Sequence, residues 1–259
     1  MSIARDIGAE TFELARAGRE LYSVFVRTLY YVARGRRERG AVVRQMYEIG
    51  NKSFVFLTIT MGFIGMIMVY QSGIQTKRVL PEFSLLGATF LELLTRDLAA
   101  SLAALMLATR VGAGIAAEIG SMVVTEQVDA LRMSAADPID YLIKPRFIAS
   151  IVMTTALVIW GGFVMFSVGG AVGYFAFDIH WRTWASLQLV SAGDLITGLT
   201  KCVAYGAAIP VVSGYCGLST FGGSEGVGWA TTRAVVSSSL AIIILNFFIS
   251  GAAYVLFPK

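Results

Sequence analysis

The sequence predicts an all-α, polytopic membrane protein with about five transmembrane helices. Of its 259 residues, 56% are hydrophobic and only 15% are charged, whereas an ordinary soluble domain carries about 25% charged residues. The mean hydropathy is +0.69, and one aqueous core of this size cannot hide so much apolar surface. Uncharged apolar runs of spanning length recur along the chain. Together these observations place most of the chain in lipid, and we expect one domain over 1–259.

The first 50 residues differ from the rest because they alternate charged and apolar residues at helical spacing. One helical face carries the larger apolar side chains, and the charged residues lie elsewhere. That face consists of Leu14, Leu21, Phe25, Leu29 and Val32. The pattern predicts an amphipathic helix that lies at the membrane surface. A solvated cytosolic helix is the alternative.

Five segments are apolar and long enough to cross about 30 Å of hydrocarbon, which takes roughly 20 residues. They form a membrane region over 53–257 and lie at 53–70, 84–109, 147–177, 194–217 and 234–257. The third is long enough to tilt, or to bend at Gly161 and Gly162. With the N-terminus inside, 15 Lys and Arg residues fall in inner segments and 4 in outer ones. Because basic loops stay on the cytoplasmic side, we expect a cytoplasmic N-terminus and an external C-terminus.

Four charged residues lie inside the predicted spans, beyond their end residues, and each charge costs about 2.5 to 3.5 kcal/mol near the membrane centre. Glu92 and Arg96 are four residues apart and can pair within one helix. Asp97 and Lys201 can pair only between helices or with a ligand. Two interpretations follow. The charges either form structural ion pairs or make a polar patch that receives a charged lipid headgroup.

The longest polar insertion between spans is the segment 112–145, which we expect to fold on the cytoplasmic side. Helical spacing predicts one face with Glu118, Thr125, Asp129 and Arg132. A second helix start is predicted at Asp137 and Pro138, with Asp as the cap and Pro in the first position, and Pro145 is expected to separate it from the third span. The first residues of this segment, GAGIAA at 112–117, match a dinucleotide-binding pattern, but no strand is predicted before them. Those glycines more readily allow close helix packing or a bend.

Catalytic and metal sites are not indicated by the sequence. Glu126 and Asp129 could form an acid/base pair, but a solvated or partner-docking face fits their surroundings better. A phosphate-binding loop is missing, and the single histidine, His180, cannot build a multi-histidine metal site. Cys202 and Cys216 are too far apart on one helix to pair. We see no nucleic-acid-binding motif.

Three motifs resemble the MlaE-type permease family of bacterial phospholipid ABC transporters. They are AAEIGSMVVTEQVDAL at 116–131, DPIDYLIKPR at 137–146 and GVGWATTRAVVSSS at 226–239. The resemblance covers the chain from about Val43 to its end. It implies a single permease domain in the bacterial inner membrane, with the C-terminus in the periplasm. The N-terminal helix resembles the elbow helix of the family in pattern, not in letters.

The same resemblance implies a homodimer that encloses a lipid cavity and docks on a cytoplasmic ABC ATPase. ATP and magnesium would be bound by that partner, and this chain would hold no cofactor. An MCE-domain lipid-binding protein on the periplasmic side and a small cytoplasmic STAS-like subunit are further expected partners. The segment 112–145 resembles the coupling segment of the family. Its expected ATPase contacts are Glu126, Gln127, Val128, Asp129, Ala130 and Leu131.

The phospholipid path is the second implication of the resemblance. Arg96, Asp97 and Lys201 match polar positions along it, and Glu92 joins them as a candidate lipid contact. One departure concerns the residues after Asp97, because the family commonly has Gly-Pro where this chain has Ala99 and Ala100. The kink expected from Gly-Pro would then be absent, which bears on the shape of the cavity. A secondary, ion-coupled transporter that uses the same charges is the alternative function, and a membrane-embedded lipid enzyme would need a nucleophile or metal that the motifs do not supply.

Overall fold

The computed structural model describes the backbone of residues 3–35, 39–79, 83 and 85–257, and the side chains of 16–35, 40–78, 83 and 85–257. All regular elements in these ranges are helical. Five helical stretches among them are long and apolar enough to cross a membrane: Gly40–Arg78, Leu86–Val124, Ile139–Phe177, Ala192–Leu218 and Gly223–Leu256. The all-α class and the five predicted spans are confirmed.

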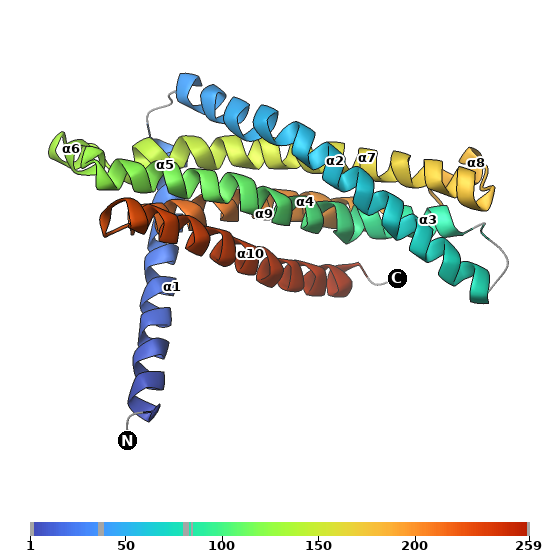
Figure 1. Cartoon of the computed structure of the whole chain (residues 1–259), viewed down its shortest axis with the longest axis horizontal. Helices are drawn as coiled ribbons and strands as arrows, with labels where there is room; N and C mark the ends of the chain where they lie inside the picture. Colours follow the sequence, from blue (N-terminus) through green and yellow to red (C-terminus); the bar gives the residue numbers. More distant parts are fainter. Residues whose placement is uncertain (1–2, 36–38, 80–82, 84, 258–259) are drawn as a thin grey trace.

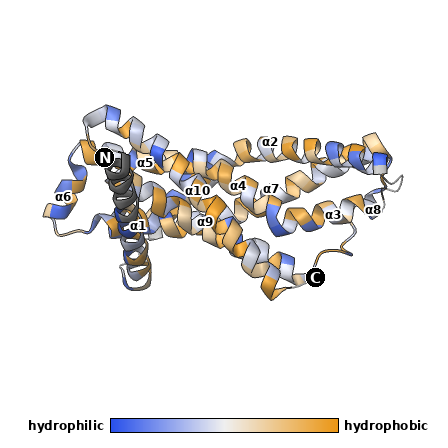
Figure 2. Ribbon diagram, turned by 90° about the horizontal axis from the view of Figure 1, so that it is seen from below, coloured by the Kyte–Doolittle hydropathy of each residue, from blue (hydrophilic) through white to orange (hydrophobic). Residues whose placement is uncertain are grey.

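Helix α1 (Ile3–Arg34) lies across the direction of the spans, which run side by side (Figure 1, Figure 2). It packs on α7 (Lys144–Phe177), on α9 (Ala192–Leu218) and on η3 (Ile139–Ile143), a π-helical turn directly before α7. Thr28 is fully buried in this contact, while Tyr22 and Tyr30 on the other side are exposed. Leu29, on the predicted apolar face, is 43% exposed, because α1 docks on the bundle through a neighbouring face. The side chain of Leu14 lies outside the described residues.

Helix α2 (Arg39–Val79) begins 14 residues before the predicted first span. The polar residues of 40–52 interrupt the hydropathy signal but not the helix. α2 packs along α7 (Lys144–Phe177), and Leu57 and Met61 are fully buried there. A Cβ added to Gly161 would lie 3.2 Å from Met61 Cγ. The helix is continuous through Gly161, so this glycine serves close packing of the two spans.

The second span runs through α3 (Leu86–Leu93), a π-helical turn η1 (Leu94–Leu98), α4 (Ala99–Leu107), a second π-helical turn η2 (Ala108–Gly112) and α5 (Ala113–Val124). It therefore extends 15 residues beyond the predicted end at residue 109. A Cβ on Gly112 would lie 3.0 Å from Ser213 Oγ. Of the two roles expected for the glycines of this segment, the structure shows close packing at Gly112.

The stretch 118–132 of the polar insertion folds as two helical pieces, which corrects the prediction of one continuous face. Glu126 has a φ of 58°, a left-handed conformation that ends α5 before the short helix α6 (Gln127–Met133) begins. A third π-helical turn, η3 (Ile139–Ile143), starts after Pro138, and Asp137 Oδ1 accepts a hydrogen bond from Ile139 N at 3.0 Å. The predicted start is thus confirmed. Pro145 does not separate two helices, because it sits in the first turn of α7, where its missing N–H costs little.

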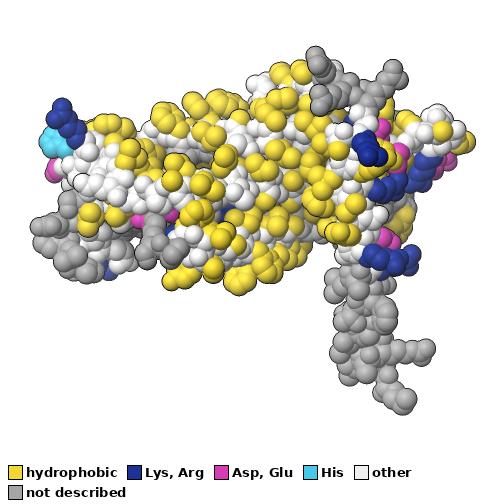
Figure 3. Space-filling view, turned by 180° about the vertical axis from the view of Figure 1, so that it is seen from behind, with side chains coloured by type: hydrophobic (Ala, Val, Ile, Leu, Met, Phe, Trp, Pro, Cys, Tyr) yellow, Lys and Arg dark blue, Asp and Glu magenta, His cyan; other side chains and the backbone are white. Residues whose placement is uncertain are grey.

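The last elements are the short α8 (Trp181–Trp184), α9 (Ala192–Leu218) and α10 (Gly223–Leu256). α9 contacts α5, α7 and α10. In its most apolar stretch 56% of the residues are buried, the largest share among the five spans, whereas the share in α10 is only 11%. Apolar side chains cover the middle of the face shown in Figure 3, and Lys, Arg, Asp and Glu gather toward its ends. This is the surface expected of a bundle that spans a lipid bilayer.

Candidate functional site

The predicted intramembrane charges come together where η1 meets α9. Arg96 and Asp97 lie in the π-helical turn η1, directly before Ala99 and Ala100. The helix continues through the two alanines. The chain departs from α-helical geometry just before them, in η1. A Cβ on Gly198 would lie 2.3 Å from the Thr95 carbonyl oxygen. Only a glycine allows α9 to approach η1 this closely, and Lys201 lies one turn further along α9.

Lys201 and Asp97 form an ion pair between the second and fourth spans. Lys201 Nζ lies 2.5 Å from Asp97 Oδ1, and Ser101 Oγ donates to the same oxygen at 3.0 Å. The lysine side chain is fully buried, whereas that of Asp97 is 41% exposed. The predicted interhelical pairing is confirmed. The cluster thus neutralises its buried cation and leaves the carboxylate accessible from one side.

Arg96 is paired with a residue that the sequence analysis missed. Its Nη1 lies 3.6 Å from Asp194 Oδ1, and the Asp194 side chain is only 3% exposed. Asp194 also caps α9, because its Oδ2 accepts from Ser191 N at 2.9 Å while Ser191 Oγ accepts from Asp194 N at 3.3 Å. The spacing Ser-x-x-Asp could have revealed this capping box. The pairing with Arg96 depends on the tertiary contact. Glu92 lies half-buried on α3, one turn before Arg96.

An apolar pocket is lined by Thr95 and Cys202, the chain neighbours of Arg96 and Lys201, although the charged side chains of the cluster do not line it. It has a volume of about 430 Å³ and lies between the second, third and fourth spans. Its walls include Leu94, Gly162, Phe166, Leu199 and Cys202. Cys202, which follows Lys201 directly, is buried and free, as is Cys216. A charged cluster beside an apolar pocket can accommodate a headgroup and part of an acyl chain.

The six predicted ATPase contacts lie at the start of α6, at the far end of the molecule from α8 (Figure 1). Glu126 precedes the helix, and Gln127 to Leu131 are within it. Val128 is only 2% exposed, so it anchors α6 to the bundle and cannot present its side chain to a partner in this conformation. Asp129 is exposed and lies 3.1 Å from Arg132. The exposed side of α6 is therefore available for docking.

Two contacts between spans fix the base of this insertion. Arg146 Nη2 at the start of the third span lies 2.8 Å from Glu118 Oε1 at the end of the second. The guanidinium is buried at 3% exposure and also donates to the Leu142 carbonyl at 3.2 Å. Arg110 donates to Ser53 Oγ on α2 at 2.9 Å. These contacts hold the first, second and third spans together close to the insertion.

Helix α1 is bound to the same insertion through Asp137. Tyr31 Oη donates to Asp137 Oδ2 at 2.7 Å, and Arg27 forms an ion pair with that oxygen. Partial burial alone would raise the pKa of Asp137, but the hydrogen bonds from Tyr31 and Ile139 N and the charge of Arg27 bring it below the ordinary value of 3.8. The hydrogen bond to Asp137, together with burial, raises the pKa of the Tyr31 phenol above 10.0. Both groups hold this contact at neutral pH.

These features define the class of protein: a five-span helical membrane protein with a partly accessible polar cluster inside the bundle and a folded polar insertion between the second and third spans. A family model described as "Permease MlaE" matches residues 42–252. The chain belongs to the MlaE permease family. The resemblance stated from its three motifs is confirmed, and the match begins one residue before the predicted Val43.

Named relatives agree with this assignment. A probable ABC transporter permease protein of Rickettsia bellii is 36% identical over 252 residues, which cover 96% of this chain and 97% of the relative. A probable ABC transporter permease protein of Synechocystis sp. is 40% identical, over 85% and 84% of the two chains. The intermembrane phospholipid transport system permease protein MlaE of Haemophilus influenzae is 30% identical, over 82% of each chain.

Proposed function

We propose that this chain is the permease subunit of an ABC transporter that moves phospholipids between the inner membrane and the outer envelope. The observation that carries the proposal is the cluster of Arg96, Asp97 and Lys201 beside an apolar pocket, in a member of the MlaE permease family. Charged groups inside a membrane mark the paths of polar substrates. A phospholipid combines the two chemistries that this cluster and pocket offer.

Lipid contact is assigned to Arg96, Asp97, Lys201 and Glu92. Asp97 is the most accessible member of the two ion pairs, at 41% exposure. A lipid phosphate that approaches the cluster would first meet Arg96, which is 25% exposed. It would reach the fully buried Lys201 only after Asp97 moves aside. Both cations already have carboxylate partners, so a lipid phosphate would have to replace a carboxylate at each cation that it binds. This exchange would limit the free energy of lipid binding and so permit release of the lipid.

Free energy for transport would come from a separate ATPase that holds ATP and magnesium and docks on the exposed side of α6. A partner that binds two conformations unequally can drive the change between them. Two copies of this chain would enclose the lipid cavity, and the largely exposed α10 fits a surface shared between such copies and lipid. An MCE-domain protein on the periplasmic side and a STAS-like cytoplasmic subunit complete the assembly that the family suggests.

Relatives named as ABC transporter permeases favour this function over a secondary transporter. A secondary transporter would use Asp97 and Lys201 as an ion site and would work without an ATPase. Lipid transfer by the reconstituted chain in the absence of ATP and of the ATPase would support that alternative instead.

The docking role of α6 is tested by reversing an exposed charge. Asp129→Arg should lower the amount of lipid moved per ATP by about tenfold or more, because a like-charge contact at an interface costs several kcal/mol. The measurement combines ATP hydrolysis and transfer of a fluorescent phospholipid in proteoliposomes that hold the permease and its ATPase.

Two variants control this experiment. Asp129→Asn removes the charge without reversing it and should have a smaller effect, and Gln188→Arg introduces a cation at an exposed position between α8 and α9. If Asp129→Arg leaves the transfer per ATP unchanged, α6 is not the docking element.

A further inference from the structure

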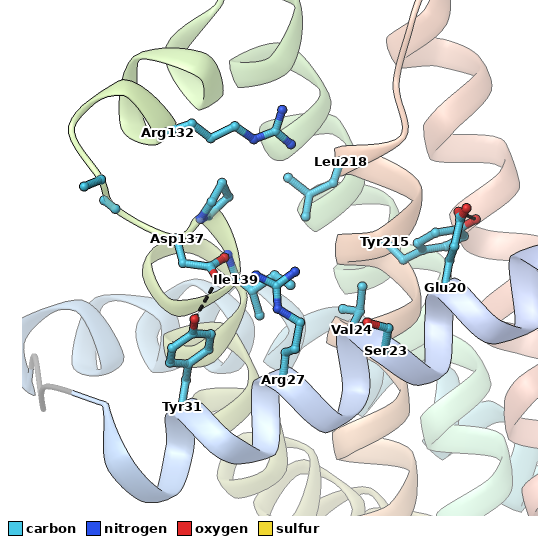
Figure 4. A pocket seen from close by; sticks show the side chains of 13 residues that line it. Glu20, Ser23, Val24, Arg27, Tyr31, Arg132, Asp137, Ile139, Tyr215 and Leu218 are labelled. Carbon is cyan, nitrogen blue, oxygen red and sulfur yellow. Dashed lines mark hydrogen bonds and ion pairs between the residues drawn. The ribbon is translucent and has the colours of Figure 1, made fainter.

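A second pocket lies at the opposite end of the bundle from the Asp97 cluster. It has a volume of about 840 Å³ and opens between α1, the segment that follows α6 and the end of α9 (Figure 4). Leu218, on its wall, is 17 residues beyond Lys201 on α9, which corresponds to about 25 Å along a helix. The two sites are thus separate.

Two arginines from different elements line this pocket. Arg27 comes from α1 and Arg132 from α6. Figure 4 shows both side chains reaching into the space between these elements. Each guanidinium carries five N–H donors, and the described ion pairs engage one terminal nitrogen of each, with Asp137 and with Asp129. Donors therefore remain for another acceptor.

The two acids of the pocket wall are already engaged. Asp137 accepts from Arg27, Tyr31 and Ile139 N. Glu20 accepts from Arg16 Nε at 3.2 Å and from Tyr215 Oη at 3.1 Å. The formal charges of the four charged lining residues, Glu20, Asp137, Arg27 and Arg132, cancel, and Asp129, the partner of Arg132, adds one negative charge beside the pocket. A bound phosphate therefore depends on the arginine donors that these acids leave open, and a singly charged phosphodiester meets less repulsion from the acids than a nucleotide or another multiply charged phosphate.

We propose that this pocket binds a phosphate group between Arg27 and Arg132, and that the phosphate belongs to a phospholipid headgroup of the adjacent leaflet. Arginine forks match phosphate oxygens in geometry and charge. The apolar side chains of Val24, Ile139 and Leu218 also line the pocket, which favours a lipid over inorganic phosphate. Exposed apolar residues on α1, Val26 and Tyr30 among them, would place the pocket at headgroup level.

A bound phosphate would join α1 to α6, because one arginine comes from each. The site would then make the link between the interfacial helix and the polar insertion depend on lipid. It is independent of the transport path proposed above, so either proposal can fail without the other.

The test is a native mass spectrometry titration of the full chain with dihexanoyl phosphatidylglycerol. Arg132→Gln should weaken binding of this lipid about tenfold, the effect of losing a charge-assisted hydrogen bond at a partly exposed site. Arg132→Lys should give an intermediate loss because it keeps the charge without the planar fork. The matched control is Arg19→Gln, which removes the same charge from an exposed position of α1 that does not line the pocket, and it should change the affinity less than twofold.

The same comparison is made in a Lys201→Met background, so that a lipid at the Asp97 cluster does not mask the difference. Equal losses for Arg132→Gln and Arg19→Gln would overturn the proposal, since they would indicate diffuse attraction to basic residues. A second arm adds inorganic phosphate as competitor. If it displaces the lipid at comparable concentrations, the phosphate site stands but its assignment to a lipid is overturned.

Discussion

At the scale of single residues, Gly198 decides whether the polar cluster can form. The close approach of its backbone to the Thr95 carbonyl brings Lys201 within reach of Asp97. In a membrane, small residues at helix contacts permit such approaches and the packing that holds spans together. A glycine on α9 therefore controls an ion pair one turn away.

Gly198→Ala should destabilise the protein by about 3 kcal/mol, the upper part of the range for overpacking, because its Cβ would meet backbone and not a flexible side chain. The control is Gly114→Ala on α5, where an added Cβ has open space and should stabilise the helix by about 0.5 to 1 kcal/mol. Thermal unfolding in detergent measures both. Equal unfolding temperatures for the two variants would contradict the close approach.

The Asp97 and Lys201 pair should respond asymmetrically to removal of each partner. Asp97→Asn leaves a fully buried lysine without its carboxylate and should cost about 3 kcal/mol, the low end for a broken buried pair because Asp97 is 41% exposed. Lys201→Met leaves a carboxylate that is not enclosed by the bundle and should cost less, about 1 kcal/mol. Thermal unfolding of both variants checks the order, and a larger loss for Lys201→Met would show that the carboxylate is the less accessible partner.

At the scale of elements, α1 is held by hydrogen bonds and an ion pair at Asp137, and its amphipathic pattern alone did not indicate this. The folded-state pKa of Asp137 is lowered, so its stabilising contribution is present above 3.8 and is lost as the pH falls through the lowered value. The pKa of Tyr31 is raised, so its contribution is present below 10.0 and is lost as the pH rises through the raised value. The docking of α1 should be constant between about pH 5 and pH 9.

Asp137→Asn should release α1 more than Tyr31→Phe does, because Asp137 makes two contacts with α1, to Arg27 and to Tyr31, whereas Tyr31 Oη makes one of them. Hydrogen-exchange protection of residues 24–31, corrected for the intrinsic effect of pH, should fall several-fold in Asp137→Asn and less in Tyr31→Phe. The wild-type protection should not vary between pH 5 and pH 9. A loss of protection within that window would assign the docking to another titrating group.

At the scale of the whole molecule, the excess of Lys and Arg on one set of connections predicts that α6 and the N-terminus face the cytoplasm. Both native cysteines are buried, so introduced cysteines report topology with low background. In intact cells, Ser134→Cys after α6 should resist a membrane-impermeant thiol reagent and Gln188→Cys before α9 should react. The reverse pattern would invert the topology.

The sequence determined the fold class, the five spans and the family, because hydropathy and motifs are local along the chain. It placed the helix start at Asp137 correctly, since capping is local as well. It missed the early start of α2 and the continuity of α7 through Pro145, because polar residues and a first-turn proline need not end a helix that its neighbours support. It also missed the break at Glu126.

Only the tertiary structure decided how these elements meet. The partner of Arg96 is Asp194, on a helix that begins almost 100 residues later, and Val128 faces the interior although its neighbours on α6 are exposed. The two pockets likewise draw their walls from segments far apart in the chain. Such contacts depend on how packed helices are rotated and how far apart they lie. Close approaches at Gly112, Gly161 and Gly198 help to set this rotation and separation, and the pattern of residues along the chain records neither quantity.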